Sequence, residues 1–184
     1  MEIVLDKEVV VKGRVLGFER LTVQLPDGRQ TGREIIRHPG GCVIIPVDKE
    51  KNVYLVRQYR VAIGSETIEL PAGKLEKGEE PLSCAKRELF EETGIKAGKI
   101  TFVTSIYPSP GYSSELLHIF LAEDIEVGEA SPDDGEFVEA FKAPMRGLLD
   151  NVLEGRIRDA KTVIGLLLAD RIIGGGSVAE ADVH

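Results

Sequence analysis

The segment that decides the fold runs from Gly73 to Ile95 and reads GKLEKGEEPLSCAKRELFEETGI. In its second half, apolar residues recur at a spacing of three or four, which is typical of an amphipathic helix: Leu82, Ala85, Leu89 and Phe90. Proline suits the first turn of a helix and glycine the position just after its end, so Pro81 and Gly94 predict both boundaries. We therefore expect a helix over residues 81–93.

Three carboxylates of this helix share one face, because two of them follow the first at i+3 and i+4: Glu88, Glu91 and Glu92. They lie near the C-terminal end, where the helix dipole disfavours negative charge and like charges repel one another. A solvated acidic face is one interpretation. A bound hard cation is the other, because it would turn this electrostatic cost into a gain.

The surroundings of the helix favour the cation. Glu79 adds a fourth carboxylate at the helix start, and Arg87 can hold a carboxylate with two hydrogen bonds. Residues 70–73 (LPAG) predict a rigid strand exit, and Gly73 allows the backbone to approach a ligand. Magnesium is typically held by one or two carboxylates together with substrate phosphates, whereas zinc prefers histidine and cysteine, which this carboxylate set lacks. We expect Mg2+, with Mn2+ as a substitute.

This segment resembles the Nudix box, G-x5-E-x7-R-E-U-x-E-E-x-G-U, in which U is a bulky apolar residue. Every defined position is filled, without gap or substitution: Gly73, Glu79, Arg87, Glu88, Leu89, Glu91, Glu92, Gly94 and Ile95. The resemblance implies a metal-binding loop–helix–loop in a Nudix α/β/α sandwich, a fold of the α/β class (α+β, with a mixed sheet). It also implies hydrolysis of a nucleoside diphosphate linked to another moiety.

The resemblance assigns roles to the residues of the box. Glu88, Glu92 and the carbonyl oxygen of Ala72 are the implied metal ligands. Glu91 is implied as a further ligand or as a group that orients water, so Glu91 and Glu92 also count among the implied catalytic residues. The remaining positions are implied to be structural: Gly73, Glu79, Arg87 and Gly94.

A loop between two predicted strands, residues 107–115 (YPSPGYSSE), bears on the substrate. An ordinary turn-rich connection is one interpretation. The other is a substrate loop, because the segment resembles a loop of the ADP-ribose pyrophosphatase subfamily, in which a proline lies about 15 residues beyond the box, as Pro110 does here. The resemblance implies Glu115 as the catalytic base, acting by positioning water, with Ser109 and Gly111 as substrate contacts.

Three more substrate contacts are implied by the resemblance: Glu34, Arg60 and Glu76. Arg57 and Arg60 point to opposite faces of a strand, so only one of them can line the site, and the resemblance favours Arg60 as a phosphate contact. Glu34 would act across a dimer whose N-terminal strands reach the partner. The alternative for Arg60 is a strand-end arginine in solvent, and Glu34 and Glu76 are equally compatible with a plain surface position.

Elsewhere the sequence predicts short strands and two further helices. Strands are expected at residues 9–15, 21–24, 33–37, 42–46, 53–59, 66–70, 99–105, 116–122 and 137–142. Helices are expected at residues 144–154 and 159–173, and a turn at residues 26–28 (PDG). We divide the chain into an antiparallel, dimerising β extension (residues 1–38), a Nudix hydrolase domain (39–173) and a disordered tail (174–184).

Composition limits the partners. The chain has 184 residues, 42% of them hydrophobic and 29% charged, which is the balance of a soluble globular protein. A net charge of -8 argues against general attraction to nucleic acid, and no apolar run approaches the about 18 residues that a membrane span needs. The N-terminal residues lack a signal-peptide pattern. Cys42 and Cys84 have neither metal-ligand nor disulfide-framework spacing, so we expect a cytoplasmic protein.

The residues outside the box add no competing chemistry. His38, His118 and His184 do not cluster, and His118 and Cys84 are expected to be ordinary core residues. The sequence predicts a metal-dependent homodimeric hydrolase that cleaves ADP-ribose to AMP and ribose 5-phosphate, or cleaves a close nucleoside diphosphate sugar. The alternatives are a pyrophosphohydrolase acting on other sugar nucleotides, dinucleotides or triphosphates, and a non-catalytic sensor that binds ADP-ribose.

Overall fold

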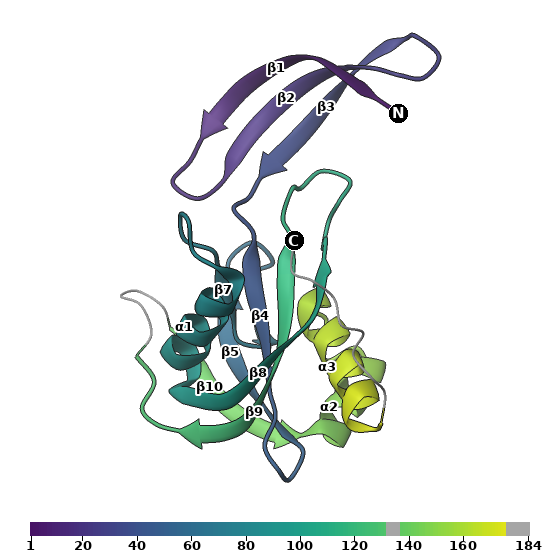
Figure 1. Cartoon of the computed structure of the whole chain (residues 1–184). Helices are drawn as coiled ribbons and strands as arrows, with labels where there is room; N and C mark the ends of the chain where they lie inside the picture. Colours follow the sequence, from purple (N-terminus) through teal and green to yellow (C-terminus); the bar gives the residue numbers. More distant parts are fainter. Residues whose placement is uncertain (132–136, 176–184) are drawn as a thin grey trace. The chain divides into compact units, whose positions relative to one another are not determined.

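The computed structural model of the chain describes residues 1–131 and 137–175. These residues form two compact units (Figure 1). The first contains Met1–Gly40 together with Ile106–Leu117, and the second contains Gly41–Ser105 together with the chain from His118 onward. The loop predicted to bind substrate therefore belongs to the same unit as the N-terminal strands, although it follows the carboxylate helix in the sequence.

The first unit is built on a three-stranded antiparallel sheet in the order β1-β2-β3. Its strands are β1 (Ile3–Lys12), β2 (Gly17–Gln24) and β3 (Gln30–Arg37). The predicted turn at residues 26–28 connects β2 to β3, where the backbone N–H of Leu25 donates to the carbonyl of Arg29 at 2.8 Å. The loop at residues 107–115 joins this unit through Ile36, whose N–H donates to the carbonyl of Tyr112 at 2.7 Å.

The prediction for the first strand was wrong at both ends. The strand was expected over residues 9–15, but β1 begins at Ile3 and ends at Lys12. Its register against β2 pairs Ile3 with Gln24 and Lys12 with Gly17, so the chain must turn between them, and the N–H of Gly13 donates to the carbonyl of Leu16. The polar residues at positions 6–8 hid the first half of the strand, because the whole of β1 is exposed and shows no alternation of apolar and polar residues.

The second unit contains two sheets, of order β7-β4-β9-β8 and β10-β5-β6. The strands are β4 (Gly41–Pro46), β5 (Asn52–Arg60), β6 (Ser65–Glu69), β7 (Ala72–Lys74), β8 (Ile95–Ile106), β9 (Leu117–Val127) and β10 (Glu139–Pro144). Six of them overlap predicted strands, although β8 begins four residues earlier and β9 ends five residues later than expected. The exception is β7, which the sequence indicated only as a strand exit and which pairs antiparallel with Gly41–Val43.

The sheets of this unit lie between helices, in the layer order predicted (Figure 1). The helix α1 (Pro81–Thr93) covers one face, and α2 (Met145–Leu153) with α3 (Ala160–Ile173) lies on the other. Alternate residues of β4 serve the two faces, as the period of a strand requires. Cys42 and Ile44 pack in the core beneath α1, whereas Ile45 lies against Gly165 of α3. This explains why all six residues of β4 are buried.

The boundaries predicted for the carboxylate helix are confirmed. Proline stands in its first turn, and Gly94 caps its end with φ of 70°, in the left-handed region that favours glycine. A side chain at Gly94 would also lie 2.5 Å from the carbonyl oxygen of Gly128. The predicted apolar stripe was partly wrong, because Leu82 is exposed, whereas Cys84 is buried and takes its place in the core.

The two C-terminal helices also match their predicted ranges to within one or two residues. In α3 the side chain of Asp159 caps the N-terminus by accepting from the N–H of Thr162 at 3.0 Å. Along α3, Leu166 is buried and the next residue, Leu167, is exposed. Of the predicted disordered tail, residues 176–184 lie outside the described residues.

Candidate active site

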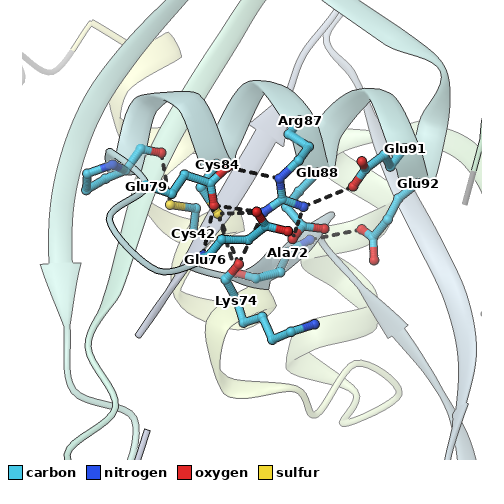
Figure 2. A network of polar contacts seen from close by, with 12 residues as sticks. Cys42, Ala72, Lys74, Glu76, Glu79, Cys84, Arg87, Glu88, Glu91 and Glu92 are labelled. Carbon is cyan, nitrogen blue, oxygen red and sulfur yellow. Dashed lines mark hydrogen bonds and ion pairs between the residues drawn. The ribbon is translucent and has the colours of Figure 1, made fainter. Parts of the chain in front are cut away.

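The candidate site lies where β7 meets the carboxylate face of α1 (Figure 2). The backbone N–H of Ala72 donates to Oε2 of Glu92 at 3.0 Å. The carboxylate of Glu88 lies directly over Gly73, so that a Cβ built on this glycine would be 1.9 Å from the carboxyl carbon. Both glutamates are buried, with exposures of 9% for Glu88 and 6% for Glu92. The short strand β7 thus presents its backbone to two buried carboxylates.

Arg87 is the centre of an ion-pair network in this site (Figure 2). Its Nε and Nη2 atoms bind the two oxygens of Glu79, each at 2.9 Å, in the bidentate contact that the sequence suggested. Its Nη1 atom contacts Glu88 at 2.7 Å and Glu91 at 3.0 Å. A further bond from Nη2 reaches the carbonyl of Lys74 at 3.2 Å, which links α1 to β7. One cation therefore holds three carboxylates and the strand together.

The network shifts the protonation equilibria of its members. Hydrogen bonds from Arg87 lower the pKa of Glu79 to about 2, so this carboxylate is ionised at neutral pH. The same contacts raise the pKa of Arg87 above its already high value. Beneath the helix, a hydrogen bond with Cys42 and burial both raise the pKa of Cys84, which keeps it a neutral core thiol, as predicted.

A cavity of about 190 Å3 opens beside these carboxylates. It is lined by Arg60, Ala72, Gly73, Lys74, Glu76, Arg87, Glu88 and Glu92. Arg57, the other arginine of β5, lies elsewhere: it pairs with the exposed Glu139 at 3.0 Å and covers the ring of Phe141. The cavity combines carboxylates, which suit a cation, with a guanidinium, which suits a phosphate.

The residues of the cavity fit a hard divalent cation by their chemistry. Carboxylate oxygens of Glu88 and Glu92 and the backbone of Ala72 are the oxygen donors that such ions prefer, and Gly73 leaves the space that the Glu88 carboxylate occupies. Within residues 1–131 and 137–175, however, no three acidic, histidine or cysteine side chains converge on one point. Arg87 keeps the carboxylates of Glu79, Glu88 and Glu91 apart, because it lies between them and binds each of them.

The other predicted site residues belong to the first unit. Glu34 is exposed on β3, opposite Arg20 in the register with β2. The carbonyl of Ser109 accepts from the N–H groups of residues 112 and 113, which shapes the loop, and Gly111 is exposed. Glu115 lies beside His38, with 3.7 Å between its Oε1 atom and Nε2 of the imidazole.

Three charged residues that the sequence did not single out form a network that includes Arg60. Its guanidinium binds both oxygens of Glu69, each at 2.7 Å, and Lys161 contacts the same carboxylate. Lys161 also pairs with Asp159 at 2.9 Å. A charged residue between two apolar ones, as in Ile68-Glu69-Leu70, was the available signal, because buried charges are almost always paired. Its partners are distant in the sequence and could not be identified from it.

A model of the NUDIX domain matches residues 37–163 of the chain. The chain belongs to the NUDIX family. Over 162 residues it is 41% identical to the ADP-ribose pyrophosphatase of Bacillus subtilis (strain 168), covering 87% of this chain and 88% of that protein. It is 38% identical to the methanol dehydrogenase activator of Bacillus methanolicus (86% and 87% covered) and 33% identical to the GDP-mannose pyrophosphatase of Escherichia coli O1:K1 / APEC (89% and 92% covered).

The fold of this NUDIX protein also has a solved counterpart. A crystal structure of an ADP compounds hydrolase superposes with a TM-score of 0.83 over 95% of each chain, at 23% identity. The predicted family, the predicted mixed α/β/α fold and the prediction of a Nudix enzyme are confirmed. Hydrolases of this family generally need divalent metal ions. None of the described helices has the length and apolar character of a membrane span.

Proposed function

We propose that the chain is a Mg2+-dependent pyrophosphatase that hydrolyses ADP-ribose to AMP and ribose 5-phosphate, and that Mn2+ can replace Mg2+. The observation that carries the proposal is the cavity in which Arg60 faces the same space as Glu88 and Glu92. Such a pairing suits a diphosphate neutralised from two sides, by bound cations and by a guanidinium. Similarity to a pyrophosphatase of ADP-ribose at 41% identity, against 33% for one of GDP-mannose, favours ADP-ribose as the substrate.

In this proposal each residue has one task. Glu88, Glu92 and the carbonyl of Ala72 hold the divalent cation, with Glu91 as a further ligand or water-orienting group. A cation bound there neutralises the diphosphate and acidifies water. Arg60 and Glu76 contact the substrate, and Glu34, Ser109 and Gly111 are proposed as further substrate contacts.

The reaction adds one water molecule. The water oxygen attacks one phosphorus, and the bond from that phosphorus to the bridging oxygen breaks, which yields two phosphate monoesters. Glu115 holds the attacking water in place and accepts the proton that this water loses as its oxygen bonds to phosphorus. Arg60 would make the enzyme selective for substrates that contain a pyrophosphate bond, because a guanidinium can bind oxygens of two neighbouring phosphoryl groups at once.

We further propose a cytoplasmic homodimer whose β extension (residues 1–38) mediates association. Strand β1 exposes apolar side chains along its length, namely Ile3, Val4, Leu5, Val9, Val10 and Val11. Contiguous exposed apolar surface is typical of an interaction site. Sedimentation equilibrium of the pure protein is expected to give twice the mass of the chain, 20.1 kDa. A single species of one chain at micromolar concentration would contradict the dimer.

The test of the function is a panel of nucleotides incubated with the protein and Mg2+, with the products resolved by chromatography. The panel contains ADP-ribose, ADP-glucose, GDP-mannose, NADH, a diadenosine polyphosphate and nucleoside triphosphates. AMP and ribose 5-phosphate are expected from ADP-ribose, and EDTA or Glu92→Gln is expected to abolish their formation. Glu80→Gln, an exposed glutamate at the start of the same helix, serves as the matched control.

Two results would redirect the proposal. Faster turnover of GDP-mannose or another member of the panel would leave the metal site standing and remove ADP-ribose as the substrate. Binding of ADP-ribose without turnover of any compound would instead identify a sensor.

A further inference from the structure

Glu69 is a buried carboxylate at the end of β6 that no proposed step uses. Its side chain is 2% exposed. Four donors surround it: Nε and Nη2 of Arg60, each at 2.7 Å, the hydroxyl of Thr67 and the ammonium of Lys161. A buried carboxylate is costly unless its oxygens are paired and hydrogen-bonded, and this one is bonded at both oxygens. Its partners therefore fix its position.

Arg60 stands between two cavities of the second unit. One is the cavity of about 190 Å3 that Glu88 and Glu92 line, and the other has about 1020 Å3 and is lined by β6, residues 154–158 and the start of α3. The side chain of Arg60 is 44% exposed, so its guanidinium is accessible to a ligand. Two of its five N–H groups bind Glu69, which leaves three for other acceptors.

An arginine at such a boundary needs an orienting partner. Arginine is among the side chains that lose most rotamer entropy when they are ordered, and a contact made by an already ordered group avoids this cost. The hydrogen bond to Glu69 is the main cause that raises the pKa of Arg60, and the charges of Glu69, Asp159 and Glu92 add to it. Without Glu69, the carboxylates of Asp159 and Glu92 would remain as nearby negative charges that attract the guanidinium. The bidentate contact with Glu69 opposes that attraction.

The position of Glu69 is itself held by the start of α3. Lys161 is 13% exposed and bridges Glu69 and Asp159, the residue that caps the helix. The hydroxyl of Thr162 donates to Asp159 at 2.6 Å and accepts from the N–H of Leu70 at 2.8 Å. This closed network ties the end of β6, three residues before Ala72, to the first turn of α3.

We propose that Glu69 is a positioning residue that holds the guanidinium of Arg60 for contact with the substrate diphosphate, and that Lys161 holds Glu69 in turn. The inference rests on the proposed function, because it assumes that Arg60 binds the diphosphate. It extends the active site from the box to the first turn of α3, which lies about 80 residues further along the chain.

A double-mutant cycle on kcat/KM for ADP-ribose tests the proposal. Arg60→Gln is expected to lower kcat/KM about 30-fold, as for the loss of a charge-assisted hydrogen bond, and Glu69→Gln about tenfold. Because Glu69 acts through Arg60, the double variant is expected to match Arg60→Gln within about threefold. Glu139→Gln, which removes the carboxylate of the exposed ion pair with Arg57 on the same strand, is the matched control and is expected to stay within twofold.

A second readout separates positioning from folding. Binding of α,β-methylene ADP-ribose, which cannot be hydrolysed at the bridge, is measured by calorimetry, and thermal unfolding is recorded for every variant. When Arg60 is present, Glu69→Gln is expected to weaken binding of the analogue about tenfold. In the Arg60→Gln background, adding Glu69→Gln is expected to change the affinity for the analogue by less than about twofold. A factor that is equal in both backgrounds would overturn the proposal, because a merely structural loss would weaken both.

A third variant keeps the proposal testable if Glu69→Gln does not fold. Lys161→Gln leaves the contact between Glu69 and Arg60 in place and removes only its support. It is expected to lower kcat/KM about threefold in the original chain and to have no effect in Arg60→Gln, whereas Lys161→Arg is expected to restore the loss. Additive losses would overturn the inference. If the unsubstituted protein neither binds nor cleaves any nucleotide of the panel, the proposed function fails, and the positioning role fails with it.

Discussion

Replacement of Gly73 by alanine tests whether the backbone of β7 and the carboxylate of Glu88 must approach each other. The added Cβ would lie 1.9 Å from the carboxyl carbon and from Oε1 of Glu88, whereas ordinary van der Waals contact begins at 3.4 Å. The carboxylate must therefore move by about 1.5 Å, because a flexible side chain yields more easily than the paired strand. A shift of this size breaks the 2.7 Å contact with Arg87 and displaces a proposed metal ligand.

The expected result is a folded protein with little activity. Misplacement of a reacting group by about 1 Å costs about 100-fold in rate, so kcat for ADP-ribose should fall at least that far. Stability should fall by about 1–3 kcal/mol, because the buried carboxylate of Glu88 loses its contact with Arg87. Gly73 lies outside the left-handed region, so alanine also lowers the entropy of the unfolded chain, which is a gain of less than about 1 kcal/mol. A strained rotamer of Glu88, which costs about 0.5–1.5 kcal/mol, offsets that gain.

The assay combines turnover, metal binding and unfolding. Steady-state kinetics give kcat, titration calorimetry gives the affinity for Mg2+ and Mn2+, and urea unfolding gives the free energy of unfolding. Gly147→Ala on α2 is the control, because a Cβ there meets nothing within 4 Å. A Gly73→Ala protein whose kcat and metal affinity stay within threefold of the original would refute the reasoning, since Glu88 would then have no fixed place in the site.

Three other substitutions or conditions test separate features. Burial alone would raise the pKa of Glu69. Hydrogen bonds from Arg60 and Lys161 outweigh this effect and lower the pKa from 4.5 to about 2. The ionised carboxylate of Glu69 therefore adds about 3 kcal/mol to the free energy of unfolding above pH 4.5, and this contribution is lost as the pH falls from 4.5 to about 2. In Glu69→Gln the free energy of unfolding should fall less steeply over that pH range. Glu115→Gln should lower kcat at least about 100-fold with KM within threefold, as for a lost base, and an unchanged kcat would remove Glu115 from the chemistry. Gly94→Ala should lower the free energy of unfolding by at least about 1 kcal/mol in urea, because φ of 70° and a carbonyl of residue 128 at 2.5 Å both oppose a side chain; equal stability would contradict this.

The parts of the structure that follow local rules were predictable. The ends of α1 depend on Pro81 and Gly94, whose preferences act within one turn, and both boundaries matched. The strand β7 was missed because three residues, one of them glycine, have no strand pattern of their own. It exists only through pairing with Gly41–Val43, about 30 residues earlier in the chain.

Burial of charge was the least predictable property. Glu88 and Glu92 are buried, whereas the apolar Leu82 on the same helix is 42% exposed, so hydrophobic periodicity identified the buried face only in part. The box identified the carboxylates because it records a chemical arrangement and not a hydrophobic one. It could not identify Glu69 or Lys161, which come together across 92 residues of sequence.

The three ion pairs of Arg87 have a consequence for the enzyme at rest. The single positive charge of Arg87 binds three carboxylates at once, so the fold does not depend on a bound ion to keep Glu79, Glu88 and Glu91 together. The proposed Mg2+-dependent activity can then follow the free magnesium concentration while the amount of folded protein stays constant. The protein would wait in an assembled form, and arrival of the ion would start turnover without a folding step.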